Sequence, residues 1–297
     1  MNKRLFVTLS MAGLAMVAFG ARKPKAAIKS SVKTVAIQQP TFTEWHDLQV
    51  NEINRLPLHT MHFAYDPNDF PGTGAEYLDK KKSMNYLSLE GTWKFNWVAN
   101  ADERPTDFYK TDLDDSKWNN IQMPGNWEML GYGQPEYVNV GFGWRGHFDQ
   151  QPPAVPIKDN HVGSYRREIN IPSNWDGKRI IAHFGSVTSN IYLYVNGKFA
   201  GYAEDSKVAA EFDITPFLKK GKNLIAFQTF RWCDGSWCED QDFWRLSGPA
   251  RENYLYARSK DHRLLDVRVE TDLKNNYKDG YLNITAKVQG NTLAYFG

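Results

Sequence analysis

Apolar and polar residues alternate along the chain in short segments that begin near Tyr86. Between residues 93 and 97, three aromatic residues alternate with two polar ones, which is the two-residue period of a half-buried strand. Similar runs follow at Ser164–Ile171, Arg179–Phe184, Ile191–Val195, Lys198–Ala203, Leu224–Phe230 and Glu252–Ala257. Short strands at this spacing predict an all-β protein built as a two-sheet antiparallel sandwich, and they favour a jelly roll.

The connections between the runs support this prediction. Asn196-Gly197 separates two of them and is typical of a tight β-hairpin, because both residues tolerate positive φ. Proline- and glycine-rich stretches at 123–133 and 150–156 separate others. No long amphipathic helical window competes with the strand pattern.

The first residues have the pattern of an export signal. Met1–Arg4 is basic, Leu5–Phe19 is apolar, and Ala18 and Gly20 supply small residues at a cleavage site. An uncleaved membrane anchor is the weaker alternative, because the apolar run is shorter than the roughly 20 residues that a bilayer requires. We therefore expect a signal peptide at 1–20, no membrane association after its removal, and a periplasmic or extracellular bacterial protein.

The rest of the chain divides into three further segments. Residues 21–60 have few large apolar residues and no sustained period, which predicts a flexible leader and an extended arm. Residues 61–260 contain the predicted jelly roll. A new alternation starts at Leu265–Glu270 and continues at Tyr281–Val288, so 261–297 are interpreted as an incomplete immunoglobulin-like domain, since that fold has about 7 strands. The chain is accordingly expected to be the front portion of a longer protein.

Charge and cysteine content narrow the range of possible functions. The chain has 36 Lys+Arg against 34 Asp+Glu, so no electrostatic feature favours nucleic acid or a membrane surface. Cys233 and Cys238 are the two cysteines. In an oxidising compartment they could close a short disulfide loop, and two free thiols are the alternative.

The segment Arg231–Arg245 has the composition of a sugar-binding surface. It contains three tryptophans, four acidic residues and two arginines. Flat aromatic faces cover the apolar C–H face of a sugar, and carboxylates accept hydrogen bonds from hydroxyls or bind a cation. A tryptophan-rich edge of the core with a solvated acidic turn is the competing interpretation.

Several phrases occur together in a familiar order. They are Asn54–His59, Leu87–Phe95, Met123–Met129, Tyr137–Val140, Phe212–Thr215 and Trp232–Gly248. In this order and spacing, residues 45–297 resemble the N-terminal sugar-binding jelly roll of the large bacterial β-galactosidases of glycoside hydrolase family 2. The phrase Glu239–Arg245 is the most specific of them.

The resemblance implies a five-domain enzyme that hydrolyses terminal β-D-galactosides. In such enzymes a (β/α)₈ barrel carries two glutamates, an acid/base and a nucleophile, which act as a retaining pair about 5–5.5 Å apart. This chain would contribute no catalytic residue and would be inactive alone. The resemblance further implies a sodium ion at the sugar site, magnesium elsewhere in the enzyme, and homo-oligomers such as tetramers in which residues 45–65 help to join subunits.

Two residues are carried over as sugar contacts. By motif position, Asp242 resembles the carboxylate that binds sodium beside the galactose 6-hydroxyl, and Asn139 resembles the amide that contacts ring hydroxyls. An ion pair of Asp242 with Arg245 or Arg231, and a turn role for Asn139, are the alternatives. Asp240 and Glu239 are expected to be structural.

The aromatic residues and histidines are assigned mainly to structure. Trp144 lies in an irregular stretch and is expected to be exposed as a sugar platform. Core positions are expected for the other tryptophans near the motif, Trp127, Trp232 and Trp244. His147 and His161 are expected at the surface.

Two other functions compete with the galactosidase interpretation. A stand-alone secreted carbohydrate-binding module would not account for the second alternating segment near the C-terminus. An enzyme in which Asp240 and Asp242 act as acid and base is weaker still, because acids so close in one loop rarely flank a scissile bond. Two features depart from the family pattern, the insertion Trp144–Phe148 and the two cysteines. They leave open which galactoside is the natural substrate.

Overall fold

The computed structural model describes residues 3–10, 38–66, 69, 79–145 and 148–290. Contacts divide the chain into two units, one formed by residues 37–57 and 64–258 and the other by 1–36, 58–63 and 259–297. Every strand pairing is antiparallel, and the helices of the described residues are all short 3-10 turns, so the all-β prediction is confirmed. No helix among these residues is both long and apolar enough to cross a membrane.

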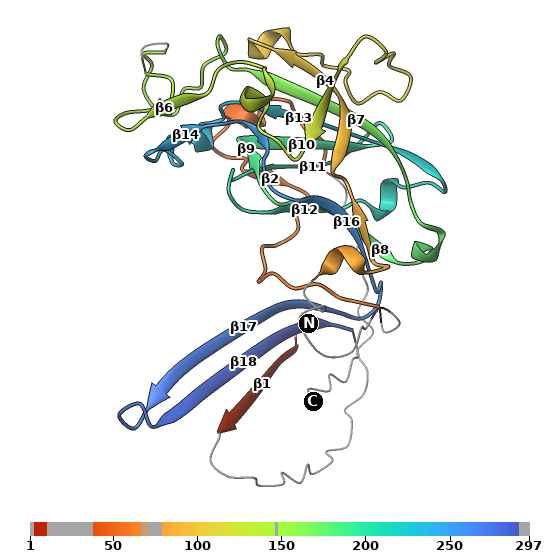
Figure 1. The fold of residues 1–297 in the computed structure, drawn as a ribbon, viewed down its shortest axis with the longest axis vertical. Coiled ribbons are helices and arrows are strands. Elements are labelled where there is room, and N and C mark those ends of the chain that lie inside the picture. Colours follow the sequence, from red (N-terminus) through yellow and green to blue (C-terminus); the bar gives the residue numbers. More distant parts are fainter. Residues whose placement is uncertain (1–2, 11–37, 67–68, 70–78, 146–147, 291–297) are drawn as a thin grey trace. The chain divides into compact units, whose positions relative to one another are not determined.

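The larger unit is a two-sheet sandwich (Figure 1). Its seven-stranded sheet has the order β2 (Glu52–Ile53), β11 (Lys198–Glu204), β10 (Asn190–Val195), β13 (Lys222–Phe230), β7 (Val162–Asn170), β4 (Gly91–Val98), β5 (Asn119–Met123). Its four-stranded sheet has the order β12 (Ala210–Asp213), β8 (Arg179–Phe184), β16 (Asn253–Arg258), β3 (Tyr86–Ser88). This arrangement confirms the antiparallel jelly-roll sandwich.

Two short ladders and several 3-10 turns complete this unit. The ladders pair β6 (Glu136–Val138) with β14 (Phe243–Arg245) and β9 (Val187–Thr188) with β15 (Gly248–Pro249). The turns are η1 (Glu44–His46), η4 (Lys80–Lys82), η5 (Ala101–Glu103), η6 (Trp127–Leu130), η7 (Ser173–Trp175), η8 (Thr215–Phe217) and η9 (Asp234–Trp237). The predicted hairpin at Asn196-Gly197 is confirmed: it joins β10 to β11 with φ of 51° and 79°.

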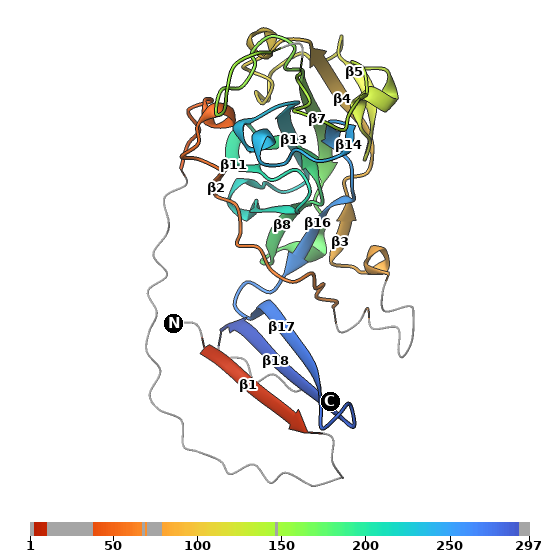
Figure 2. The same ribbon diagram turned by 90° about the vertical axis from the view of Figure 1, so that its left-hand side faces the viewer.

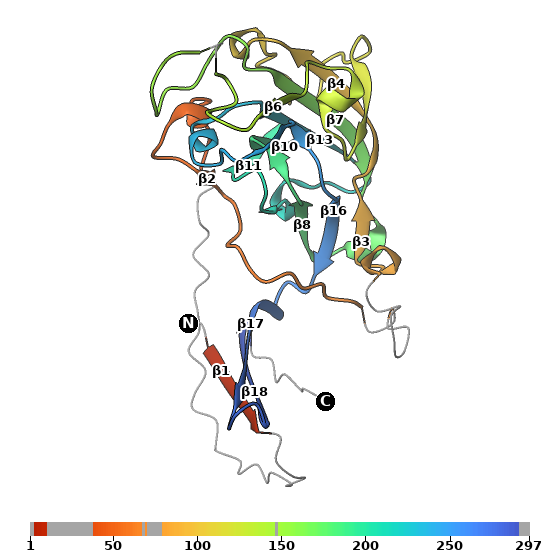
Figure 3. The same ribbon diagram turned by 60° about the vertical axis from the view of Figure 1, so that its left-hand side comes forward.

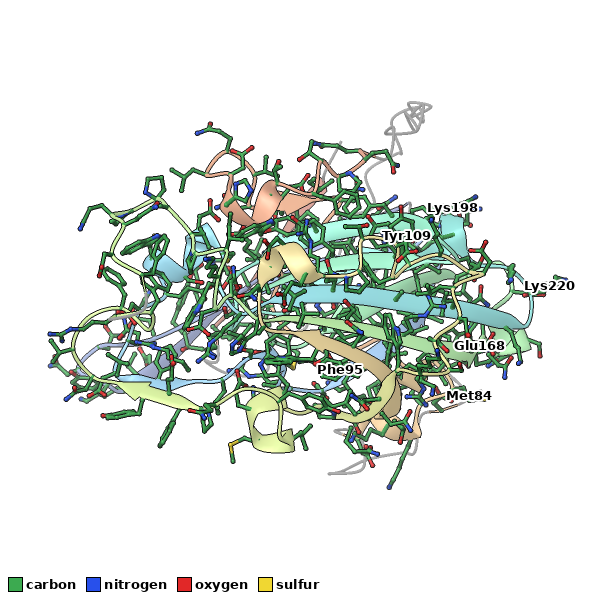
Figure 4. The ribbon with its side chains drawn as sticks, turned by 90° about the horizontal axis from the view of Figure 1, so that it is seen from above. Met84, Phe95, Tyr109, Glu168, Lys198 and Lys220 are labelled. Carbon is green, nitrogen blue, oxygen red and sulfur yellow. The ribbon has the colours of Figure 1, made fainter. Side chains whose placement is uncertain are left out.

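The main core lies between the two sheets. Trp93 and Phe95 of β4 point into it with at most 1% of their surface exposed, as the alternation predicted. They belong to one cluster with Phe184 and Phe212 of the facing sheet and Phe227 of their own sheet. Figure 4 shows Phe95 on β4 inside the body, whereas Glu168, Lys198 and Lys220 lie at its edge.

A second cluster covers the outer face of the seven-stranded sheet. Tyr192 and Tyr194 alternate along β10 with the inward-facing Ile191 and Leu193, so this strand is buried on both faces. Trp45 of the arm stacks on Phe230 with ring centroids 4.9 Å apart. The Tyr192 hydroxyl accepts from the backbone N–H of Trp45 at 3.2 Å and donates to Glu44 Oε2 at 3.0 Å. The first part of the arm is therefore packed on the sandwich.

The smaller unit contains a three-stranded sheet (Figures 2 and 3). Its order is β1 (Lys3–Ser10), β18 (Asp279–Gln289), β17 (Arg263–Lys274). β17 and β18 correspond to the second alternating segment of the sequence. β1 lies in the predicted signal segment and pairs along β18 from Lys3–Val288 to Ser10–Tyr281. Residues 11–37, which include the second half of the predicted signal peptide and the first part of the predicted leader, lie outside the described residues.

Candidate functional site

The ladder of β6 and β14 positions the two predicted contact residues. Its last pair is Val138 with Phe243, so Asn139 and Asp242 are the first residues beyond the same end of the ladder. Side chains alternate between the two faces of a ladder. Tyr137 and Trp244 form a pair on one face, and Asp242 contacts this face through its hydrogen bond with the Tyr137 hydroxyl. Figure 1 shows β6 and β14 side by side at one end of the sandwich.

Asp242 is an exposed carboxylate held by one hydrogen bond. The Tyr137 hydroxyl donates to Asp242 Oδ1 at 2.5 Å, and this bond raises the pKa of Tyr137. Within the described residues Asp242 makes no ion pair, neither with Arg245 nor with Arg231. One carboxylate oxygen therefore stays available to a ligand. Asn139 is also exposed, immediately after the end of β6.

Trp244 is not a core residue, and that expectation is wrong. Its side chain is 55% exposed, and that of its cross-strand partner Tyr137 is 52% exposed. The two ring centroids are 5.6 Å apart with planes inclined by 48°. Because a ladder of only two strands has no second layer on this face, its outward side chains stay in solvent.

Trp144 is buried, so the expectation that it is exposed is also wrong. Only 4% of its surface is accessible, and it packs edge-to-face against Trp232 and Trp237 at 5.1 and 4.6 Å. Gly143 permits this packing, because a Cβ there would lie 2.6 Å from the Trp232 ring. Trp144 thus belongs to a secondary core, and we do not assign it to the sugar. Trp127 and Trp232 are buried, as expected.

The other charged residues of Arg231–Arg245 are engaged in structure. Arg245 pairs with Asp240, and Glu239 accepts from the backbone N–H of Ser206 at 2.8 Å and from its hydroxyl. These contacts agree with structural roles for both acids. Arg231 pairs with Glu136 of β6 at 2.9 Å, which ties the ladder to the end of β13.

His161 is buried, against the expectation of a surface position. It is only 7% exposed, with Nε2 3.1 Å from Asp159 and Nδ1 3.1 Å from the Arg231 guanidinium. Burial and the neighbouring Arg231 lower the pKa of His161, which favours the neutral ring. The sequence does not indicate that His161 is buried, because its contact with Arg231 joins residues 70 positions apart. His147 lies outside the described residues.

Both cysteines are free, so the disulfide alternative is not realised. Cys233 is buried and Cys238 is exposed. Cys233 lies with Glu204 and Asp234 in a buried group whose ligand-type atoms are all within 4.8 Å of one another. Burial raises the pKa of Glu204 to about 8, with a further contribution from Asp234. Burial also raises the pKa of the Cys233 thiol.

A small cavity lies behind the ladder. Its walls include Gly143, Trp232, Asp240 and Arg245, and its volume is about 30 Å³. That space holds a water molecule or two but no hexose ring. A sugar at this end of the sandwich would therefore contact the exposed face of the ladder and not the cavity behind it.

Two of the phrases noted in the sequence meet beside the site. The backbone N–H of Gly125 donates to Pro249 O at 2.8 Å, and that of Trp127 to Ser247 O at 3.2 Å. Glu128 accepts from the backbone N–H of Ser247 at 2.8 Å. These hydrogen bonds thus hold the segment around η6 against residues 247–249, which follow β14.

Fold and site together define a class: an antiparallel β-sandwich domain that presents aromatic, acidic and amide side chains on one exposed ladder. Residues 86–259 match the model of the glycosyl hydrolases family 2 sugar binding domain. The chain therefore belongs to glycoside hydrolase family 2, and the sandwich is its sugar-binding domain.

Curated relatives carry consistent names. The chain is 39% identical over 250 residues to a β-galactosidase of Priestia megaterium, covering 83% of this chain and 24% of that protein. It is 34% identical over 256 residues to a β-galactosidase large subunit of Leuconostoc lactis, covering 82% of this chain and 40% of that subunit. The chain thus spans about a quarter to two fifths of these relatives.

Solved structures support the fold. A Bacteroides uniformis β-glucuronidase superposes with a TM-score of 0.53 at 22% identity, covering 70% of this chain and 22% of that one. At this identity the likeness concerns the fold alone.

Proposed function

We propose that this chain is the galactoside-contacting part of an exported, retaining β-galactosidase. The observation that carries the proposal is the end of the β6–β14 ladder, where Asp242 accepts a hydrogen bond from Tyr137 beside the exposed ring of Trp244, and where Asn139 follows β6. The names of the relatives supply the substrate class. The basic and apolar residues before position 20 support export.

The roles follow from the chemistry of each side chain. The free oxygen of Asp242 binds a sodium ion next to the sugar, because a hard cation prefers carboxylate oxygen. The Asn139 amide both donates to and accepts from vicinal ring hydroxyls. Asp240 and Arg245 neutralise each other and keep the loop in place. None of these groups has a partner arranged for acid/base work, so the chain binds sugar without cleaving it.

Titration of the chain with sugars tests the proposal. We expect methyl β-galactoside to bind more tightly in sodium buffer than in choline buffer, and more tightly than methyl β-glucoside or methyl β-glucuronide. We also expect no turnover of a chromogenic β-galactoside. Preference for the glucuronide, or turnover that persists after removal of host enzymes, would contradict the proposal.

A further inference from the structure

An aromatic pair, Tyr137 and Trp244, lies exposed beside Asp242. Tyr137 and Trp244 each leave more than half of their surface in solvent. Because less than half of each side chain is buried, the pair gains little hydrophobic stabilisation. The two residues form a cross-strand pair of the ladder, and the Tyr137 hydroxyl donates to Asp242. Aromatic side chains that are exposed next to polar groups are typical of ligand sites.

We propose that Tyr137 and Trp244 form a stacking platform for a hexopyranoside ring, and that the Tyr137 hydroxyl positions Asp242 for the polar edge of the same sugar. This inference rests on the proposed function and adds to it the surface that holds the apolar face of the sugar.

The geometry assigns a separate task to each part of the platform. The two rings are inclined by 48° with centroids 5.6 Å apart, so they form a shallow angled surface rather than a closed stack. The C–H face of a pyranose packs on such rings, while its hydroxyls extend past their edge. At that edge the Tyr137 hydroxyl donates to Asp242, and Asn139 follows two residues after Tyr137.

The hydroxyl of Tyr137 links the platform to the acid. By donating to Oδ1 at 2.5 Å, it fixes the carboxylate rotamer and leaves Oδ2 for a cation or a sugar hydroxyl. Without this bond, an exposed aspartate would sample several rotamers, and ordering it would cost part of the binding free energy. Tyr137 is thus a positioning residue as well as half of the platform.

Saturation-transfer NMR and titration with methyl β-galactoside, on the whole chain, test the platform. Trp244→Ala should weaken binding at least about tenfold, as for aromatic side chains that a ligand covers, and abolish transfer to the C–H protons of the sugar. Trp244→Tyr should retain most of the affinity, because it keeps a ring. Tyr277→Ala, which removes another exposed ring (82% exposed), is the matched control and should bind like wild type.

Tyr137→Phe separates stacking from positioning. It keeps the ring, so transfer to the C–H protons should persist, whereas the enhancement by sodium should fall about fivefold, as expected for one lost hydrogen bond. Unchanged sodium dependence would overturn the positioning role. Affinity within twofold of wild type in a folded Trp244→Ala variant would overturn the platform.

The outcomes also separate this inference from the proposed function. If the chain prefers methyl β-glucuronide and that binding depends on Trp244, the platform stands and the galactoside assignment fails. If the chain prefers the galactoside and Trp244→Ala has no effect, the reverse holds. Failure to bind any of these sugars would contradict both.

Discussion

The two halves of the segment Arg231–Arg245 differ in how far their tryptophans are exposed to solvent. In the first half, Trp232 and Trp237 pack against Trp144, and Arg231 pairs with Glu136. In the second half, Asp242 and Trp244 stand exposed on a two-stranded ladder. Identical residue types therefore build a core in one half and a binding surface in the other. The difference arises from layering: the first half lies under the loop that carries Trp144, and the second has no layer above it.

Truncating one tryptophan from each half should give the largest contrast. Trp232→Ala should lower the free energy of unfolding by about 3–5 kcal/mol, because it leaves a cavity among packed rings. Trp244→Ala should change it by no more than about 0.5 kcal/mol, as is usual for surface positions. Urea unfolding measures both. Equal losses for the two variants would show that Trp244 is part of the core.

A methyl group added at Gly143 should sharpen the contrast within the buried half. Its Cβ would lie 2.6 Å from the Trp232 ring, so Gly143→Ala should cost about 1–3 kcal/mol of stability through overpacking. Gly280→Ala is the control, since a Cβ there meets nothing within 4 Å. A Gly143→Ala variant as stable as the control would mean that Trp144 and Trp232 are not in close contact.

Substitution of the two aspartates, Asp240 and Asp242, should also affect stability differently. Asp240→Asn removes the charge partner of the buried Arg245 and should cost about 1–3 kcal/mol of stability. Asp242→Asn should leave the melting temperature close to that of wild type, because Asp242 is exposed. Thermal unfolding followed by circular dichroism compares them. A larger loss for Asp242→Asn would reverse the assigned roles.

Stability should depend on pH through Glu204. Its pKa is raised to about 8 in the folded chain, above the ordinary 4.5, so the folded state binds the extra proton. The corresponding stability is present below pH 4.5 and is lost as the pH rises through 8, by at most about 1.4 kcal/mol per pH unit. Glu204→Gln should flatten the decline of the melting temperature between pH 5 and 8. A decline of wild-type steepness in this variant would exclude Glu204 as its source.

The strands could be predicted from the sequence because burial imposes a two-residue period on them. The runs at Arg179–Phe184 and Lys198–Ala203 coincide with β8 and β11 to within one residue. Asn139 and Asp242 were found by motif, and both lie just beyond the same end of the β6–β14 ladder. Exposure of the tryptophans could not be predicted, since Trp144 and Trp244 differ only in whether another loop covers them.

Tyr137 illustrates the same limit. It lies within the phrase Tyr137–Val140, but its hydrogen bond to Asp242 spans 105 residues and depends on the register of a three-residue ladder. Its alternation with Asn139 was the signal that could have placed both side chains on one face.

The measurement that tests the central claim most directly is the sodium dependence of galactoside affinity in Asp242→Asn. A ligand contact through a charged group is worth about 1.5–3 kcal/mol, so the variant should bind methyl β-galactoside roughly 10- to 150-fold more weakly in sodium buffer. It should also bind equally in sodium and choline, with its fold unchanged. Wild-type affinity and wild-type sodium dependence in a folded Asp242→Asn chain would contradict the assignment of this ladder face as the sugar site.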